Sequence, residues 1–178
     1  MIDPTSSKTT GFHLFFEPAG ELASELGAII ENLSKEYGGP VFAPHITLLA
    51  RIPAGNDEDV VKKTQALADM LAPFSLTLGE LDAQDAFFKA LYIRIQEREE
   101  MDKYHAYANK IFSMKDESPY LPHLSLLYGN YEQKRKQQTI GNLAIRKGTS
   151  FRVDKIHLYR TEGEVEYWQK VREFALKG

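Results

Sequence analysis

The sequence predicts an α+β fold in which two lobes, each an antiparallel sheet with helices on its outside, are related by an approximate twofold axis and flank a central groove. Two observations lead to this fold class. The order helix, strand, helix, hairpin occurs twice along the chain, and the strand in each half carries the same pattern of a histidine, an apolar residue, a hydroxyl residue and an apolar residue. The halves share too few letters to be a sequence repeat, so the duplication lies in the order of elements.

The bulk composition is typical of one globular protein. The chain has 178 residues, 43% of them apolar, and we expect a single bilobal domain over residues 1–178 with residues 1–10 flexible. Its 22 Lys and Arg against 25 Asp and Glu give a net charge of −3, so no stable nucleic-acid partner is expected. Without cysteine there is no disulfide, thiolate metal site or cysteine nucleophile. The polar first ten residues and the absence of a long apolar run favour a soluble, cytoplasmic protein that does not contact a membrane.

The first elements are predicted from apolar periodicity. Phe12 to Phe16 is a short apolar run that fits a buried strand. The segment from Glu21 to Tyr37 is predicted as an amphipathic helix that stops at Gly38, and a strand from His45 to Arg51 follows it. Apolar residues recur at helical spacing in this helix, at Leu22, Leu26, Ile29, Ile30 and Leu33.

A second helix and a hairpin complete the first half. Asn56 or Asp57 can cap the helix, and Pro73 ends it. The segments from Phe74 to Leu81 and from Phe87 to Gln96 are predicted as two strands of a hairpin. The inner face of the helix is predicted to consist of Val61, Thr64, Leu67, Ala68 and Leu71.

The same order then begins again. Apolar residues between Met101 and Phe112 mark a helix, and a loop from Ser118 to Pro122 leads into the second copy of the pattern as a strand. The polar segment from Tyr131 to Leu143 is predicted to be helical. The segments from Ser150 to Tyr159 and from Glu166 to Leu176 are predicted as a closing pair of strands.

The repeated pattern is the strongest functional signal. The first tetrad is His45-Ile46-Thr47-Leu48 and the second is His123-Leu124-Ser125-Leu126. In a strand, the histidine and the hydroxyl project from one face about 6 to 7 Å apart, and the two apolar residues project from the other. For this composition, two such tetrads among five histidines arise by chance on the order of a few times in a thousand. We therefore interpret each tetrad as a half-site backed by core, with both half-sites facing the groove.

Two such half-sites suit displacement at phosphorus. Imidazoles with pKa values near 6.5 can divide into one neutral and one protonated group at neutral pH, which is an acid-base pair. One histidine would deprotonate the attacking water and the other would protonate the leaving oxygen on the opposite side of phosphorus. Thr47 and Ser125 can donate hydrogen bonds to the remaining phosphate oxygens. This set needs no metal and no cofactor, and we favour His123 as the base and His45 as the acid.

At these residues the chain resembles the two-histidine (2H) phosphoesterase superfamily, and within it the cyclic phosphodiesterase branch of plants and fungi. The likeness extends over nearly the whole chain, through Tyr120 to Tyr128, Phe87-Phe88, Ser150 to Val153 and Trp168. The resemblance implies hydrolysis of ADP-ribose 1″,2″-cyclic phosphate to ADP-ribose 1″-phosphate and of nucleoside 2′,3′-cyclic phosphates to 2′-phosphates.

The resemblance also implies roles for particular residues. The family's two catalytic histidines match His45 and His123, and its two phosphate-binding hydroxyls match Thr47 and Ser125. Tyr128 resembles a family tyrosine that lines the phosphate pocket. We expect a monomer whose partner is a small cyclic phosphate nucleotide. The resemblance also implies a role in tRNA splicing metabolism.

Other functions stay open from sequence alone. The protein could process the 2′,3′-cyclic end of an RNA, in which case binding would weaken steeply with salt. It could also be a nucleotide-binding module without turnover. A metal site is a third reading, but each tetrad offers one imidazole and a hydroxyl where zinc takes three or four nitrogen, sulfur or carboxylate ligands.

Several further polar and aromatic residues are interpreted as structural rather than functional. His105 is interpreted as helix surface, His157 as a strand residue, and His13 as a core residue that could border the groove. The basic residues from Lys134 to Lys136, with Arg146 and Lys147, are read as a solvated face. Arg51 and Lys89 could lie near the groove mouth, and Trp168 is expected in the core, with stacking on a base as the alternative.

Overall fold

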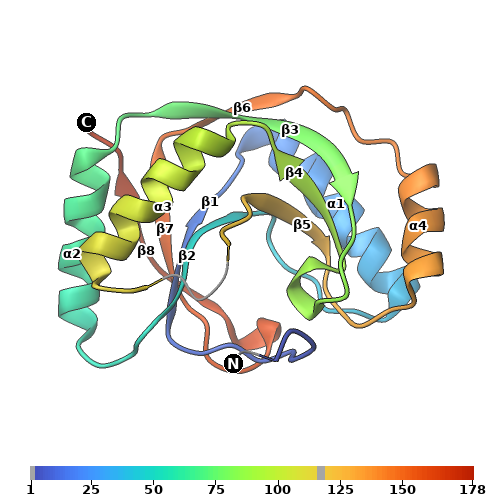
Figure 1. Ribbon diagram of the computed structural model, residues 1–178, viewed down its shortest axis with the longest axis horizontal. Coiled ribbons are helices and arrows are strands. Elements are labelled where there is room, and N and C mark those ends of the chain that lie inside the picture. Colours follow the sequence, from blue (N-terminus) through green and yellow to red (C-terminus); the bar gives the residue numbers. More distant parts are fainter. Residues whose placement is uncertain (1–2, 116–118) are drawn as a thin grey trace.

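The computed structural model describes residues 3–115 and 119–178, which form four helices and eight strands. Figure 1 labels them in chain order. They are β1 (Phe12–Phe16), α1 (Gly20–Tyr37), β2 (Ile46–Ile52), α2 (Asp57–Met70), β3 (Phe74–Asp82), β4 (Leu91–Ile95), α3 (Arg98–Phe112), β5 (His123–Leu127), α4 (Gln133–Asn142), β6 (Ser150–Val153), β7 (Lys155–Arg160) and β8 (Gln169–Ala175), with short 3₁₀ turns η1 (Phe87–Lys89) and η2 (Val165–Tyr167).

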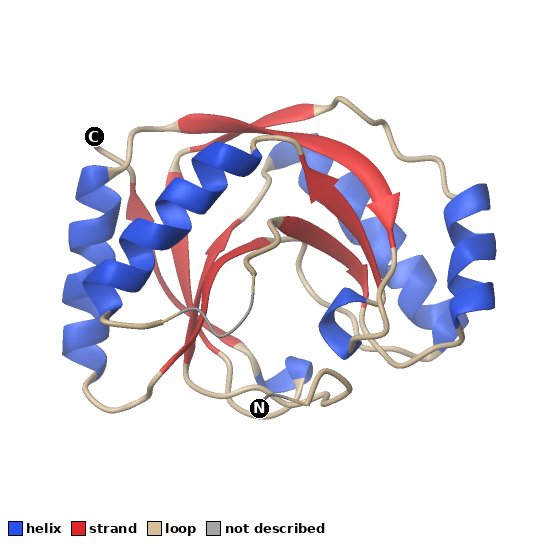
Figure 2. Ribbon diagram, in the orientation of Figure 1, coloured by secondary structure: helices blue, strands red, loops and turns tan. Residues whose placement is uncertain are grey.

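The strands form one curled antiparallel sheet in the order β6-β3-β4-β5-β2-β1-β7-β8 (Figure 2). The two tetrad strands, β2 and β5, are its central neighbours and pair at Ile46↔Leu124. They divide the sheet into two four-stranded halves, which we call the β5 half (β6-β3-β4-β5) and the β2 half (β2-β1-β7-β8). The two predicted lobes are these two halves of a continuous sheet.

The two halves of the chain exchange strands to build the two halves of the sheet. β3 and β4 come from the first half of the chain but stand beside β5, and β7 and β8 come from the second half but stand beside β1. Because each half of the sheet contains strands from both ends of the sequence, neither half of the chain can complete its sheet alone.

Two predicted strands differ in detail. Ser150 to Tyr159 is two strands, because β6 pairs with β3 in the β5 half and β7 pairs with β1 and β8 in the β2 half. The break falls at Asp154, where burial alternation changes parity: Phe151 and Val153 are buried before it, and Ile156 and Leu158 after it. The other strand, predicted from Phe87, begins at Leu91, because residues 87–89 form η1.

The helices cover the outer face of the sheet. α1 packs on β5, α3 packs on β2, and α2 packs on β7 and β8 (Figure 1). The predicted cap of α2 is confirmed at Asn56, whose side chain accepts bonds from the amides of Glu58 and Asp59 at 3.1 and 3.3 Å. The inner face of α2 contains Val60 in place of the predicted Val61, which is half-buried.

The beginning of the chain lies across both halves of the sheet. Thr9 and Gly163 exchange backbone hydrogen bonds of 3.1 and 2.9 Å, and the Phe87 amide donates to the carbonyl of Pro4 at 2.7 Å. These bonds tie residues 4 and 9 to η1 and to the segment before η2. The single-domain organisation and the flexibility of residues 1–10 stay predictions.

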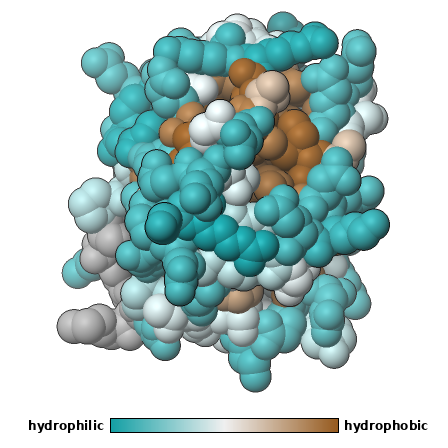
Figure 3. Space-filling view, turned by 90° about the vertical axis from the view of Figure 1, so that its right-hand side faces the viewer, coloured by the Kyte–Doolittle hydropathy of each residue, from teal (hydrophilic) through white to brown (hydrophobic). Residues whose placement is uncertain are grey.

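One side of the molecule and a cavity in the β5 half lie away from the tetrads. Hydrophilic residues dominate the side of the molecule at the right of Figure 1, with apolar residues gathered toward its upper part (Figure 3). A cavity of about 300 Å³ between α1 and the segment after α4 is lined mainly by aliphatic side chains such as Leu26, Ile29 and Ile145. In the part of the chain that the structure describes, no helix is long and apolar enough to cross a membrane.

Candidate active site

The two tetrads meet at the centre of the sheet. Ile46 and Leu124 are directly paired and fully buried, so the register that they set places His45 across from Ser125 and Thr47 across from His123. Because alternate residues share a face, these four polar side chains lie on the face opposite the two apolar ones. The charge of His45 is close enough to lower the pKa of His123. The structure therefore brings the four predicted residues together.

Both histidine rings are held in the same way. The Nδ1 of His45 donates to the carbonyl of Ala43 at 2.7 Å, and the Nδ1 of His123 donates to the carbonyl of Leu121 at 2.6 Å. A proline separates each histidine from its acceptor and favours an extended backbone at the residue before it. With Nδ1 committed to a carbonyl, Nε2 is the nitrogen that each ring has left for proton transfer.

Burial changes the ionisation expected from isolated imidazoles. His45 is only 6% exposed, and desolvation lowers its pKa, although the Ala43 carbonyl and the charge of Glu17 act in the opposite direction. Burial, with the charges of Lys89 and His45, lowers the pKa of His123 to about 4. Both rings are thus neutral at pH 7, which differs from the expectation of one neutral and one protonated histidine. A bound phosphate anion would raise both pKa values.

The two hydroxyls have different surroundings. Ser125 is 4% exposed, and its hydroxyl donates to the carbonyl of Phe88 at 2.8 Å. Thr47 is half-buried, and its hydroxyl makes no hydrogen bond to any described residue. A hydroxyl carries one proton, so Ser125 must turn away from Phe88 before it can donate to a phosphate, whereas Thr47 needs no such change.

Tyr128 belongs to the same site. Its hydroxyl is 3.2 Å from Nε2 of His45, and its ring stacks on Phe42 with a centroid distance of 3.7 Å. Burial raises the pKa of this hydroxyl, so it stays protonated and donates to Nε2 of the neutral imidazole. Tyr128 therefore bonds to the ring nitrogen of His45 that the Ala43 carbonyl does not engage.

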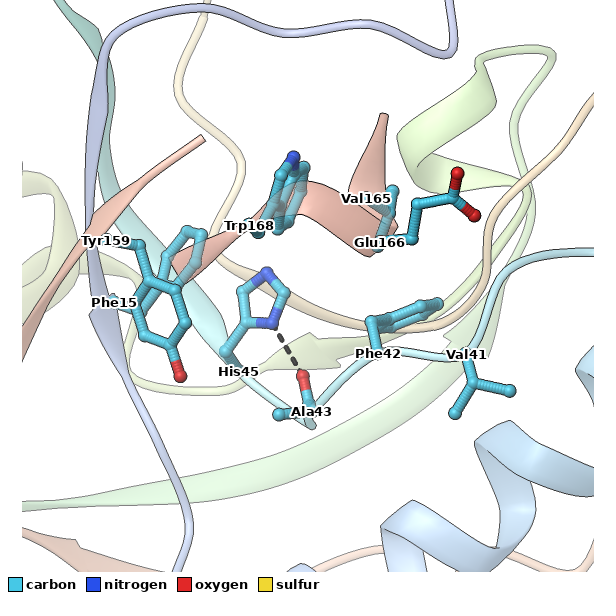
Figure 4. Close-up of a pocket in the computed structure, with 9 residues that line it drawn as sticks. All are labelled: Phe15, Val41, Phe42, Ala43, His45, Tyr159, Val165, Glu166 and Trp168. Atoms are coloured by element: carbon cyan, nitrogen blue, oxygen red, sulfur yellow. Dashed lines mark hydrogen bonds between the residues drawn. The ribbon is translucent and has the colours of Figure 1, made fainter. Parts of the chain in front are cut away.

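A pocket of about 250 Å³ opens beside His45 (Figure 4). The ring of His45 lies between Phe15 and Phe42, with Trp168 above it, and the Glu166 carboxylate points away from it. The centroids of Phe15 and His45 are 3.9 Å apart. The remaining lining residues are Val41, Ala43, Tyr159 and Val165, so the pocket touches the first tetrad and no residue of the second.

Trp168 closes the space between the two halves of the sheet. Its ring centroid lies 6.2 Å from that of His45 in the β2 half, and 5.9 Å and 6.3 Å from those of Phe88 and Tyr128. Of the two sequence readings for this residue, the position at the groove fits the structure better than a pure core position. Sequence reasoning missed Phe15, Phe42 and Tyr159, because a short apolar run does not reveal which aromatic ring borders a groove.

Three of the basic residues singled out in the sequence have different surroundings. Lys89 is half-buried at the end of η1 and close enough to His123 to lower its pKa, as expected for the groove mouth. The charge of Arg51 acts on His13. Lys136 contradicts the solvated-face interpretation: its side chain is 1% exposed and donates to the carbonyl of Gln84 and to Asp85, both at 2.7 Å.

The other histidines lie outside the paired tetrads. His13 bonds to Thr161, is buried, and has a pKa lowered to about 3 by that burial. His157 lies 3.4 Å from Glu17. The helix-surface interpretation of His105 was wrong, because its Nδ1 donates to the β2 backbone. Within the described ranges, no group of three or more histidine and carboxylate side chains is arranged to hold a metal ion.

Comparison with known proteins shows which family the chain matches and which solved structures have a similar fold. A model of the 2′-5′ RNA ligase superfamily matches residues 18–164. The chain is 28% identical to the cyclic phosphodiesterase of Arabidopsis thaliana over 161 aligned residues. The aligned region covers 86% of this chain and 88% of that protein. Its fold is similar to TT0787 of Thermus thermophilus, with a TM-score of 0.65, 16% identity and coverage of 94% and 98%. It is also similar to E. coli LigT complexed with 3′-AMP, with a TM-score of 0.61, 16% identity and coverage of 97% and 100%.

Proposed function

Because the chain belongs to the 2′-5′ RNA ligase superfamily of two-histidine phosphoesterases, we propose that it hydrolyses small cyclic phosphates by metal-independent acid-base catalysis with His45 and His123. The membership confirms the resemblance seen in the sequence and makes the chain an enzyme of the phosphoesterase class. The proposed substrates are ADP-ribose 1″,2″-cyclic phosphate and nucleoside 2′,3′-cyclic phosphates. We expect a monomeric, cytoplasmic enzyme.

One observation carries the proposal: two histidines from adjacent central strands are held alike by their Nδ1 atoms and keep Nε2 for chemistry. Hydrolysis of a cyclic phosphate needs one group to take a proton from water and another to give a proton to the leaving oxygen. Two convergent imidazoles supply both groups from opposite sides, as an in-line displacement requires.

The pocket beside His45 supports an assignment of roles. The leaving oxygen belongs to the ribose, so the nucleoside lies on the side of the general acid and the water on the side of the general base. An aromatic pocket that adjoins His45 alone suits the nucleoside. The charge of Glu17 favours the protonated form of His45, and that of Lys89 favours the neutral form of His123.

The proposed reaction then balances as follows. The oxygen of water forms a bond to phosphorus as its proton moves to Nε2 of His123, and the bond from phosphorus to the ring oxygen breaks as that oxygen takes the proton of His45 Nε2. Thr47 and Ser125 donate to the non-bridging oxygens, whose charge is thereby held during the displacement. Tyr128 must release His45 before the phosphate can approach.

A single assay tests the function and its alternatives. The protein is incubated in EDTA with ADP-ribose 1″,2″-cyclic phosphate, a nucleoside 2′,3′-cyclic phosphate and an oligonucleotide with a 2′,3′-cyclic end. Turnover of the small substrates supports the proposal. Preference for the oligonucleotide, with binding that weakens steeply in salt, favours RNA end processing. Absence of turnover on all three favours a binding module, and inhibition by EDTA would indicate a metal.

A further inference from the structure

The two halves of the sheet meet at a thin junction. β2 and β5 share the register pair Ile46↔Leu124, whereas β1 and β7 or β3 and β6 pair at four positions each. Each histidine ring is bonded to the carbonyl two residues before it. Those bonds orient each ring within its own strand and leave the distance between the two strands to other contacts.

Tyr120 supplies such a contact. It lies three residues before His123, and its hydroxyl donates to the carbonyl of Thr47, inside the first tetrad, at 2.8 Å. Burial raises the pKa of the phenol, so the hydroxyl keeps its proton and donates throughout the neutral range. This bond joins the segment that leads into the second tetrad directly to the first tetrad.

The ring of Tyr120 is fixed by α3. It stacks on His105 with a centroid distance of 3.9 Å and an interplanar angle of 4°. The Nδ1 of His105 donates to the carbonyl of Leu48 at 2.6 Å, and Asn109 lies 3.0 Å from its Nε2. Two consecutive carbonyls of β2 are therefore held by side chains of one stacked pair.

A β-bulge makes this arrangement possible. The register of β1 and β2 shifts between Leu14↔Leu49 and Phe15↔Thr47, which leaves Leu48 as an extra residue. A bulge disrupts the ladder locally and re-aims the neighbouring groups. The carbonyls of Thr47 and Leu48 accept from Tyr120 and His105 at the point where β5 no longer pairs with β2.

We propose that Tyr120 is a positioning residue, whose hydroxyl ties the first tetrad to the lead-in of the second and thereby sets the separation of the two catalytic Nε2 atoms. The inference rests on the proposed function, because it assigns to Tyr120 the geometry on which proton transfer depends. Tyr120 acts through the backbone of β2 and does not itself touch the reacting atoms.

The variant Tyr120→Phe tests this role, since it removes one oxygen atom and keeps the ring that stacks on His105. A displacement of about 1 Å can cost about 100-fold in rate, so we expect kcat to fall about 10- to 100-fold. KM should change less than about threefold, because the groups that contact the ligand are unaltered. A crystal structure of the variant should show a change of about 0.5 Å or more in the Nε2 to Nε2 distance between His45 and His123.

Tyr37→Phe is the matched control. The Tyr37 hydroxyl also donates to a distant backbone carbonyl, that of Arg135, at 3.2 Å, but it joins α1 to α4 away from the tetrads. Its kcat should equal that of the unaltered protein. The inference is overturned if Tyr120→Phe keeps kcat within about twofold, or if Tyr37→Phe loses as much. If the unaltered protein has no turnover, the proposed function fails, and the inference is then decided by the crystal structure, where an unchanged separation overturns it.

Discussion

Each of the two proposed catalytic histidines is held in place by contacts within the protein. The ring of His45 stacks on Phe15, and its Nδ1 donates to a backbone carbonyl. The ring of His123 makes the same bond through Nδ1 and packs in a T-shaped arrangement with Tyr92, with 5.2 Å between the ring centroids. Preorganisation of this kind lowers the cost of reaching the transition state, because little ordering remains for the moment of reaction.

Replacing either histidine tests the pair directly. Acid or base catalysis by one positioned side chain contributes about 10²- to 10⁴-fold, so His45→Ala and His123→Ala should each lose about that much in kcat/KM. Steady-state kinetics with a nucleoside 2′,3′-cyclic phosphate measures the loss. His157→Asn, at a buried histidine outside the tetrads, should keep its activity and serves as the control. A histidine whose removal leaves the rate unchanged has no place in the mechanism.

The shifted pKa values give a second prediction at this scale. In the proposed mechanism the free enzyme is active with His123 neutral and His45 protonated, and burial lowers both pKa values, that of His123 to about 4. The bell-shaped profile of kcat/KM should therefore centre below pH 6.5, and that of kcat should lie at higher pH, because the bound anion raises both pKa values. A kcat/KM profile centred at or above pH 6.5 would contradict the burial of the pair.

Lys89 supplies a check on that profile. Its positive charge lowers the pKa of His123, so Lys89→Gln should raise that pKa and move the acid limb of kcat/KM to higher pH. Among the described residues, the charges of Lys89 and His45 act on His123, the Tyr92 ring lies against it, and Arg94 is its register partner on β4. Lys62→Gln, on the exposed side of α2, should leave the limb where it is.

At the scale of elements, α4 supports the site through one buried side chain. Lys136 bonds to Gln84 and Asp85, in the loop that leads to η1, and η1 carries the Phe88 carbonyl that accepts from Ser125. Lys136→Met removes the donor to the part-buried Gln84 carbonyl, and an unpaired carbonyl costs about 1 to 3 kcal/mol when fully buried, so the free energy of unfolding should fall by up to that amount. Urea unfolding measures it.

Lys136→Met should also weaken substrate binding. Because η1 carries Phe88 and Lys89, loosening the loop before it should raise KM more than it lowers kcat. Lys134→Met, an exposed lysine on the same helix, is the matched control and should change neither stability nor KM. If the two variants have equal free energies of unfolding, Lys136 makes no buried stabilising contact, and the solvated-face interpretation from the sequence is correct.

The periodicity of apolar residues predicted most of the helices and strands. The strands and helices with clear periodicity were predicted within a few residues, because burial on one face imposes a spacing that the sequence must keep. The break at Asp154 and the turn at Phe87 were missed, since both depend on which distant strand the backbone reaches. The parity change in burial around Asp154 was the available signal for the break.

At the scale of the whole molecule, the two tetrads predicted that the two halves of the chain share one groove. The tetrads gave no information about the exchange of strands between the two halves of the chain. The tetrad residues were found because their chemistry repeats in similar local contexts. Tyr120, Phe15 and Phe42 enter the site through packing across the sheet, and nothing in their local sequence distinguishes them from core residues. Tertiary placement thus supplied the part of the site that carries no motif.

The junction between the halves can be followed through a natural probe. Trp168 is the single tryptophan of the chain, and its ring approaches His45 and Phe15 of the β2 half and Phe88 and Tyr128 of the β5 half. In the proposed mode of binding, a phosphate between the tetrads displaces Tyr128 from His45, and the nucleoside enters the pocket that Trp168 lines. Binding should therefore change the environment of the indole.

We expect a saturable change in tryptophan fluorescence when adenosine 2′-phosphate, a product of the proposed reaction, is added to the protein, with a midpoint equal to its inhibition constant. Trp168→Phe removes the signal and should raise KM, because the smaller ring contacts the nucleoside less. Adenosine without phosphate should bind more weakly, since the charge that pairs with the histidines is missing. Competitive inhibition without any change in emission would mean that the ligand does not reach Trp168, and the nucleoside would then have to lie outside the pocket beside His45.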